Sequence, residues 1–242
     1  MSLGLENIRI KEWYVPQFGP TKFRVFMGLL FLPYTGMVLS FTVIGSMMAE
    51  EIHWIRVLAI LVIYFLALGI GAHALDAIGR GGIKPWGTIL SNGQLWFLAI
   101  SSIMMAYIIG MYYMVLYSPL LWAIAIPEGF FLLAYNLEWF KGRFHTDFWF
   151  SVSWGGLPVL AGYIIQTNQI SVGVLLVALS MMFLSLVEIK ASRPYKEMKR
   201  QSGGDKHLEE KGGLQYLEAI LKSISIGVIL LGVGLLCWRV FE

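Results

Sequence analysis

The sequence contains few of the residues with which a water-soluble protein covers its surface. Only 14% of its 242 residues are charged, whereas 57% are hydrophobic. Soluble domains carry charge on about 25% of their residues. A soluble domain of this length could not bury so much apolar surface. The composition therefore excludes an ordinary soluble protein and indicates that the lipid bilayer is the solvent of this chain.

Several functional motifs are also missing. Cys237 is the only cysteine, which excludes an internal disulfide and a cysteine-based metal cluster. The sequence has no glycine-rich Walker loop, no Gly-x-Ser-x-Gly elbow and no zinc-type spacing of His and Cys. Nucleic acid is not expected as a partner, because the basic residues follow the membrane surface. Membrane lipids are the expected partners instead.

Seven long apolar runs are the main positive feature of the sequence. Each has about 18 to 24 residues, enough for a helix to cross roughly 30 Å of hydrocarbon. The runs are continuous and lack period-two alternation, so they predict helices rather than strands. The predicted segments are 25–48, 54–75, 94–116, 119–137, 148–165, 170–189 and 219–240. We therefore expect an all-α, polytopic membrane bundle of about seven transmembrane helices.

The basic residues predict the orientation of this bundle. All but two of the 18 Lys and Arg residues fall on the N-terminal segment, on the even-numbered loops or at the base of the last helix; the exceptions are Arg56 and Arg239. By the positive-inside rule, the N-terminus is expected in the cytoplasm and the C-terminus on the opposite side. We expect an interfacial segment over residues 1–24 and one bundle over 25–242, with a cytoplasmic loop at 190–215. The first apolar run is expected to be a transmembrane helix rather than a removable signal.

Three polar residues end the second predicted segment. His73, Asp76 and Arg80 are spaced by three and four positions, so they lie along one helical face near the cytoplasmic end. Charged residues at membrane depth are costly and usually face the interior of a bundle. One interpretation is an interfacial ion pair between Asp76 and Arg80 that ends the helix. The other is a polar mouth that binds an anion, a metal ion or both.

Glu128 lies in the otherwise apolar fourth segment, directly after Pro127. A carboxyl group at this depth is expected to have a buried polar partner, because an unpaired one is costly. The candidates are His73, Tyr107 and Tyr163, and the sequence does not choose among them.

A dense polar stretch follows the fourth segment. Lys141 and Arg143 could hold a phosphate there, although for these two cations alone ordinary positive-inside charge is the favoured explanation. Tyr135, Asn136, Glu138 and His145 lie in the same stretch and make a functional site as plausible as that explanation.

The order of these features along the chain carries a family resemblance. The features are Asp76 at the end of the second segment, the stretch from Lys84-Pro85 to Leu90-Ser91, Tyr135 with Lys141 and Arg143, and the glycine- and aromatic-rich run 150–162 that contains Trp154. In this order they resemble the UbiA superfamily of intramembrane prenyltransferases. The resemblance covers residues 24–196.

The resemblance implies a UbiA-like bundle that transfers an isoprenoid chain from a prenyl diphosphate to a lipid or aromatic acceptor. It implies catalytic roles for Asp76, Tyr135 and Glu188, with Mg²⁺ held by Asp76 and Glu188. The expected diphosphate-binding residues are His73, Arg80, Lys84, Lys141, Arg143, Arg193 and Lys196. The expected cavity residues are Tyr107, Glu128, Asn136, Glu138 and Trp154.

The sequence also departs from the family pattern. The family's first motif, N-D-x-x-D-x-x-x-D, corresponds here to Ala72, His73, Asp76 and Arg80, so only the middle Asp remains. The second motif retains one carboxylate, Glu188, among cations, and seven segments stand where the family commonly has nine. Cations could therefore neutralise an anionic head group without metal. Two other hypotheses follow: a catalytically degenerate relative that binds an isoprenoid or phospholipid or serves as a membrane subunit, and a small ion- or proton-coupled transporter.

Overall fold

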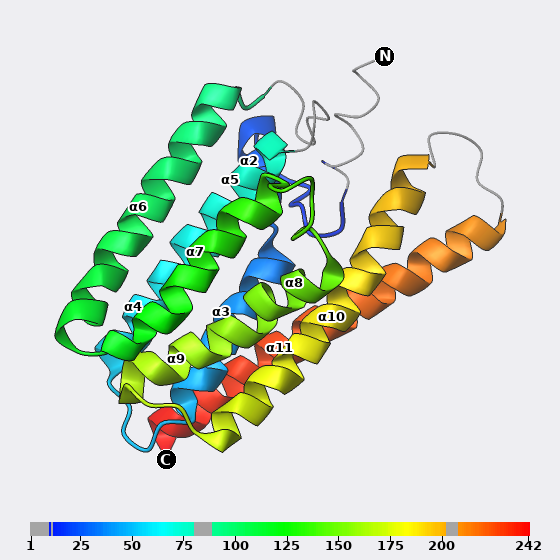
Figure 1. Ribbon diagram of the computed structural model, residues 1–242. Coiled ribbons are helices and arrows are strands. Elements are labelled where there is room, and N and C mark those ends of the chain that lie inside the picture. Colours follow the sequence, from blue (N-terminus) through cyan, green and yellow to red (C-terminus); the bar gives the residue numbers. More distant parts are fainter. Residues whose placement is uncertain (1–9, 11, 80–88, 202–207) are drawn as a thin grey trace.

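The computed structural model describes residues 10, 12–79, 89–201 and 208–242, and within these ranges all regular structure is helical (Figure 1). The elements in chain order are α2 (Thr21–Leu29), α3 (Leu32–Met47), α4 (Trp54–Tyr64), the π-helix η1 (Phe65–Ala72), α5 (His73–Gly79), α6 (Asn92–Leu116), the 3-10 helix η2 (Pro119–Leu121), α7 (Trp122–Asn136), α8 (Asp147–Ser151), the π-helix η3 (Val152–Gly156), α9 (Leu157–Thr167), α10 (Val172–Gln201) and α11 (Leu208–Phe241).

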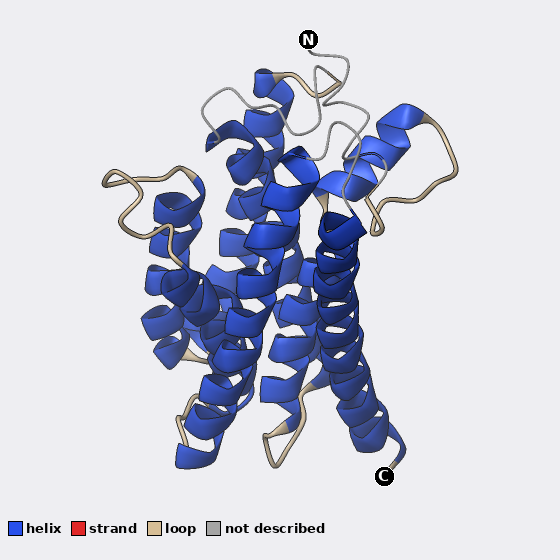
Figure 2. Ribbon diagram, turned by 90° about the vertical axis from the view of Figure 1, so that its right-hand side faces the viewer, coloured by secondary structure: helices blue, strands red, loops and turns tan. Residues whose placement is uncertain are grey.

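These elements confirm the predicted all-helical membrane bundle. Among the described residues, six continuous helical stretches are long and apolar enough to cross a bilayer, and the pair α2 and α3 makes a bent seventh. Large apolar side chains such as Phe97, Ile108 and Leu230 are exposed on the outside of the bundle, where lipid would surround them. The helices run side by side between two ends that carry the loops (Figure 2).

The first span is bent by 41° between α2 and α3. Phe31 adopts a left-handed backbone with φ of 46°, and Pro33 follows within the first turn of α3. Proline is tolerated at a helix start but cannot continue a helix that precedes it. The carbonyl of Leu30, at the bend, accepts a hydrogen bond of 2.6 Å from the Thr35 hydroxyl. The prediction of one span over 25–48 did not include this break, although Pro33 stands inside the run.

Close contact between α3 and α9 forms the centre of the bundle. A Cβ atom on Gly162 would overlap the backbone carbonyl of Thr42, and one on Gly45 would overlap that of Val159. Because both positions are glycine, the two backbones can approach closely, as small residues allow in membrane helix pairs. The Ser46 hydroxyl donates to the Gly162 carbonyl at 3.0 Å across this contact.

The segment predicted as a loop at 190–215 is instead mostly helical. α10 continues to Gln201 and α11 begins at Leu208, while residues 202–207 lie outside the described part. The prediction ended these helices where their apolar pattern ended. They continue because Lys and Glu are good helix formers and because polar contacts stabilise this part.

A polar clamp holds the N-terminal segment against α10 and α11. We use this name for Glu12, Tyr195, Lys199 and Glu218. The Tyr195 hydroxyl lies 2.9 Å from the Glu12 carboxylate and 3.2 Å from that of Glu218, and the Lys199 ammonium lies 2.6 Å from Glu12. Glu12 is buried despite its charge. Of the interfacial segment expected over 1–24, residues 1–9 and 11 lie outside the described part, and α2 begins at Thr21, before the predicted start of the first span.

The two exceptional cations lie at the end of the bundle away from this clamp. Arg56 donates to the carbonyl of Ile165 at 3.2 Å, and Arg239 donates to the carbonyls of Ala49 and Glu50. The first contact joins the start of α4 to the end of α9, and the second joins the end of α11 to the turn after α3, near the C-terminus in Figure 1. Arg56 and Arg239 thus lie at one end of the bundle, and most of the other described Lys and Arg residues lie at the opposite end.

Candidate functional site

Three helices bring polar side chains together at the same end as the clamp. We call this group the end cluster: His73 and Asp76 from α5, Tyr135 from α7, and Glu188, Arg193 and Lys196 from α10. Asp76 and Glu188 both lie close enough to the Tyr135 hydroxyl to act on it electrostatically, as does Arg193. Lys196 acts in the same way on Glu188. The structure therefore joins residues that are more than 100 positions apart in the sequence.

Arg193 connects the end cluster to the start of α8. Its guanidinium lies 3.0 Å from the Asp147 carboxylate, donates to the His145 carbonyl at 3.2 Å, and lies 3.5 Å from the Tyr135 hydroxyl. The planar guanidinium can serve several acceptors at once, which an ammonium group does less well. Arg193 is thus held in place while its side chain remains 41% exposed.

His145 supports Tyr135 from the loop between α7 and α8. The two rings stack with centroids 4.3 Å apart, and His145 Nδ1 lies 2.9 Å from the Tyr135 carbonyl. The sequence indicated His145 as part of a polar stretch that favours a functional site, but it assigned no specific role to this residue. Its spacing from Tyr135 along the chain carries no signal for this contact, because a turn brings the two rings together.

An aromatic wall flanks the His73 side of the cluster. The His73 ring lies 5.3 Å from Trp154 and 5.8 Å from Phe31, and Trp154 stacks on Phe150 at 5.3 Å. His73 Nε2 lies 3.4 Å from the Thr35 hydroxyl. Lys196 lies over the Phe31 ring at 4.8 Å.

Two π-helical stretches determine where His73 and Trp154 lie in this wall. η1 directly precedes His73, and η3 contains Trp154. A π-helical turn changes the direction in which the following side chains point, and such turns are frequent at functional sites. Simple helical periodicity could not reveal either stretch.

Glu188 and Ser192 are deeply buried polar residues of α10 beside the cluster. Their exposed fractions are 2% and 0%. Glu188 Oε1 has no hydrogen-bond partner among the described residues, whereas the Ser192 hydroxyl lies close to the Tyr34 hydroxyl. Leaving a buried polar group unsatisfied costs about 1–3 kcal/mol. Glu188 Oε1 is therefore suited to contact a bound ligand or ion.

Other predicted site residues are not part of this buried cluster. Lys141, Arg143 and Glu138 are exposed on the loop 137–146, so the expected place of Glu138 in a cavity is wrong. Glu138 and Lys141 have left-handed backbones, with φ of 53° and 60°. This turn directs the loop outward, which the sequence pattern could not indicate. Arg80 and Lys84 lie outside the described residues.

The predicted magnesium ligands fit such an ion in their chemistry. Asp76 and Glu188 supply carboxylate oxygens, and Mg²⁺ in proteins is commonly held by one or two carboxylates together with phosphate oxygens. Within the described ranges, no group of three or more His, Cys, Asp or Glu side chains is arranged to hold a metal by itself. A substrate would have to complete the coordination.

The remaining predicted cavity residues belong to different places. Trp154 lies in the aromatic wall, and Asn136 is buried and donates to the Leu132 carbonyl at 2.8 Å. The backbone carbonyl of Asn136 packs so tightly on Gly79 that no Cβ fits there, which fixes α5 against α7.

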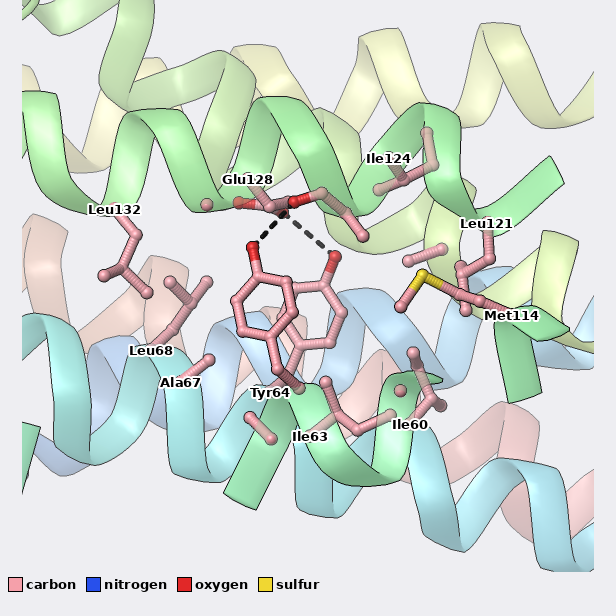
Figure 3. A pocket seen from close by; sticks show the side chains of 16 residues that line it. Ile60, Ile63, Tyr64, Ala67, Leu68, Met114, Leu121, Ile124, Glu128 and Leu132 are labelled. Atoms are coloured by element: carbon pink, nitrogen blue, oxygen red, sulfur yellow. Dashed lines mark hydrogen bonds between the residues drawn. The ribbon is translucent and has the colours of Figure 1, made fainter. Parts of the chain in front are cut away.

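Glu128 and Tyr107 line a second, apolar cavity deeper in the bundle (Figure 3). The Tyr64 hydroxyl donates to Glu128 Oε1 at 3.0 Å. None of the three expected partners is the one found: the Tyr107 hydroxyl donates to the Ala125 carbonyl at 2.9 Å instead. Tyr64 was missed because it stands in an apolar stretch where an aromatic residue is ordinary.

Comparison with known proteins adds no relative, because no family model, no curated protein and no solved structure matches this chain. The resemblance to the UbiA superfamily therefore remains a prediction, and the function has to be argued from the sites themselves.

Proposed function

We propose that this chain is a UbiA-like membrane prenyltransferase that binds a prenyl diphosphate at the end cluster. The observation that supports this most is the convergence of Asp76, Tyr135, Glu188, Arg193 and Lys196, which were expected at such a site from the resemblance, from three different helices. A site with both carboxylates and cations at one end of an apolar bundle suits an amphiphile whose head group is a phosphate.

The cations of the cluster would bind the diphosphate. Arg193 presents a half-exposed guanidinium already oriented by Asp147 and the His145 carbonyl, and Lys196 approaches from the next turn of α10. Both can form charge-assisted hydrogen bonds with phosphate oxygens. Asp76 and Glu188 would hold Mg²⁺, which when bound neutralises charge on the leaving diphosphate.

In the reaction, the bond between the allylic carbon and the diphosphate oxygen breaks, and its electron pair leaves with the diphosphate. Trp154 and Phe150 present aromatic faces beside His73, where a carbocation would be stabilised. The acceptor nucleophile then forms the new bond to that carbon, and the proton that it loses passes to the released diphosphate. The Tyr135 hydroxyl, near both Arg193 and the two carboxylates, is positioned to contact the diphosphate oxygens.

Binding of a non-hydrolysable geranylgeranyl diphosphate analogue tests this function. Affinity for the analogue is measured with the purified chain in lipid nanodiscs, in the presence of Mg²⁺ and again with a chelator. The same measurement is made on Asp76→Asn and on the matched control Glu51→Gln, whose side chain is exposed near the start of α4. We expect Mg²⁺-dependent binding that weakens by about a hundredfold in Asp76→Asn and is unchanged in Glu51→Gln.

The alternatives give different results in the same assay. Binding that is indifferent to metal and shared by phosphatidic acid would favour a relative that holds an anionic lipid without catalysis. No binding of either ligand would overturn the assignment of the end cluster.

We also propose that the end cluster faces the cytoplasm, as the distribution of Lys and Arg predicts. In a Cys237→Ser background, Glu242→Cys should react with a membrane-impermeant maleimide added outside intact cells. Labelling only after lysis would reverse the orientation.

A further inference from the structure

We infer that the Glu128 cavity is a separate binding site for a small apolar molecule that carries a hydroxyl group, such as an aliphatic alcohol or a phenol. This inference goes beyond the proposed transferase and does not depend on it. It rests on the lining of the cavity and on the buried Glu128 Oε2 atom, which has no partner among the described residues. It also rests on the hydroxyl groups of Tyr64 and Tyr107, which already donate their protons to other acceptors.

The cavity lies between α4, η1, α6 and α7. Its volume is about 70 Å³, and the space around it is partly open to the surroundings. Its walls are almost entirely aliphatic, with Ile60, Leu68, Met114 and Leu132 among them (Figure 3). The lining residues include no Lys, Arg or His. A ligand here would be mostly hydrocarbon.

The cavity lies near the middle of the membrane. Tyr64 is ten residues from the start of the span Trp54–Gly79, and Glu128 is nine residues from the start of Pro119–Asn136. At 1.5 Å per residue, both lie about 14 Å from the ends of their spans, close to half of a hydrocarbon core of about 30 Å. His73 of the end cluster lies nine residues further along the same helical span as Tyr64, or about 13 Å away.

Tyr64, Tyr107 and Glu128 carry the only side-chain oxygen atoms among the described residues that line this apolar space. Tyr64 has donated its one hydroxyl proton to Glu128 Oε1, and Tyr107 has donated its own to the Ala125 carbonyl. Both phenolic oxygens therefore retain only acceptor capacity. Glu128 Oε2 is fully buried and has no hydrogen-bond partner among the residues that the structure describes.

This arrangement favours a ligand with a hydroxyl group. A hydroxyl can donate to Glu128 Oε2 and still accept a hydrogen bond, so it satisfies the buried carboxyl group in either of its protonation states. A hydrocarbon would satisfy neither protonation state of the carboxyl group. An ether can only accept a hydrogen bond, so it would leave the ionised carboxylate and the two phenolic oxygens without a donor. A charged ligand would have to enter the centre of the membrane, where charge is costly.

Photolabelling of the intact chain in lipid nanodiscs tests the inference. The probes are an alkyl diazirine that ends in a hydroxyl group, its methyl ether of matched length, and the corresponding primary amine. We expect the alcohol to label peptides of α4, α6 and α7 about tenfold more than the ether, as one hydrogen bond to a buried carboxyl group would give. Excess 1-decanol should compete with this labelling, whereas decane should not.

Variants then locate the preference at Glu128. Glu128→Leu should reduce labelling by the alcohol to the level of the ether, while Tyr163→Phe on α9, outside the cavity lining, should leave the preference unchanged. Glu128→Gln keeps the shape of the side chain and should retain part of the preference. If Glu128→Leu does not fold, the contrast between alcohol and ether in the unaltered chain still decides the matter.

Three results would overturn the inference. These are equal labelling by the alcohol and the ether, an alcohol preference that survives Glu128→Leu, and stronger labelling by the amine than by the alcohol. The last result would mean that the cavity takes a cation, as a transporter site could. None of them depends on diphosphate binding at the end cluster, so the two proposals can fail separately.

Discussion

Glu188 and Glu128 are both carboxyl groups within membrane-spanning helices, yet their surroundings differ in kind. Glu188 shares the end cluster with Lys196, Arg193 and Asp76, near the end of the bundle. Glu128 meets a tyrosine hydroxyl and aliphatic side chains at mid-membrane. The first environment contains balancing charges and suits an anionic head group, whereas the second contains only acceptors and apolar surface and suits an uncharged donor. The two proposals thus assign one residue type to two kinds of recognition, according to its neighbours.

Gly162→Leu should abolish both sites, because they share one scaffold. A Cβ at this position overlaps the Thr42 backbone, so α3 and α9 must separate. We expect a loss of about 3 kcal/mol or more in stability, measured by thermal unfolding in nanodiscs, together with loss of diphosphate binding and of alcohol labelling. Gly234→Leu on α11, where nothing lies within 4 Å of the added Cβ, is the matched control. Equal melting temperatures for the two variants would contradict a tightly packed α3–α9 pair.

Arg193→Ala should separate the two sites. Loss of the guanidinium removes a charge-assisted contact, so binding of the diphosphate analogue should weaken by about thirtyfold, with Arg193→Lys intermediate. Alcohol labelling should not change. Lys22→Ala, which removes an exposed cation from α2, serves as the control. If Lys22→Ala and Arg193→Ala weakened binding equally, general surface charge rather than the end cluster would be responsible.

Gly129→Ala should affect the Glu128 cavity and leave the end cluster unchanged, which is the reverse of the effect expected for Arg193→Ala. The added Cβ overlaps the Tyr107 hydroxyl, so the ring must leave its bond to the Ala125 carbonyl. The tenfold preference for alcohol over ether should largely disappear, whereas diphosphate binding should stay within twofold of the unaltered chain. The check is to run both assays on one preparation. An unchanged alcohol preference would mean that the position of Tyr107 does not matter.

Ionic strength should give the smallest effect. Between 50 and 500 mM NaCl, diphosphate binding should weaken severalfold, because part of the end cluster is exposed and salt screens exposed charges. Labelling of the Glu128 cavity by the neutral alcohol should be the same at both concentrations. Equal salt dependence at the two sites would remove the electrostatic distinction between them.

The sequence was sufficient to predict the spans, because a run of about twenty apolar residues has few other structures available to it. It was less informative about the ends of helices. α10 extends past the apolar run to Gln201, where the clamp with Glu12 and Glu218 stabilises it. That clamp joins residues 183 positions apart, so no local pattern could reveal it.

Some residues of the candidate site could be named from the sequence, whereas their partners could not. Asp76, Tyr135 and Glu188 were named from their order along the chain, and the fold brings them together. Lys141 and Arg193 looked alike in the sequence, but a left-handed turn exposes Lys141 while α10 holds Arg193 inside the site. Tyr64 could be identified as the partner of Glu128 only from the packing of two helices.

The clamp also has a consequence for biosynthesis. Glu12 emerges from the ribosome early, whereas Tyr195 and Lys199 are translated more than 180 residues later and Glu218 later still. The Glu12 carboxylate therefore stays in water or among lipid head groups until the last two helices have been inserted. Only then can it form its contacts with Tyr195 and Lys199. A small pocket lined by Glu12, Phe31, Ser192 and Lys196 joins the clamp to the end cluster. The nascent chain thus cannot complete this pocket or the clamp before synthesis is nearly complete.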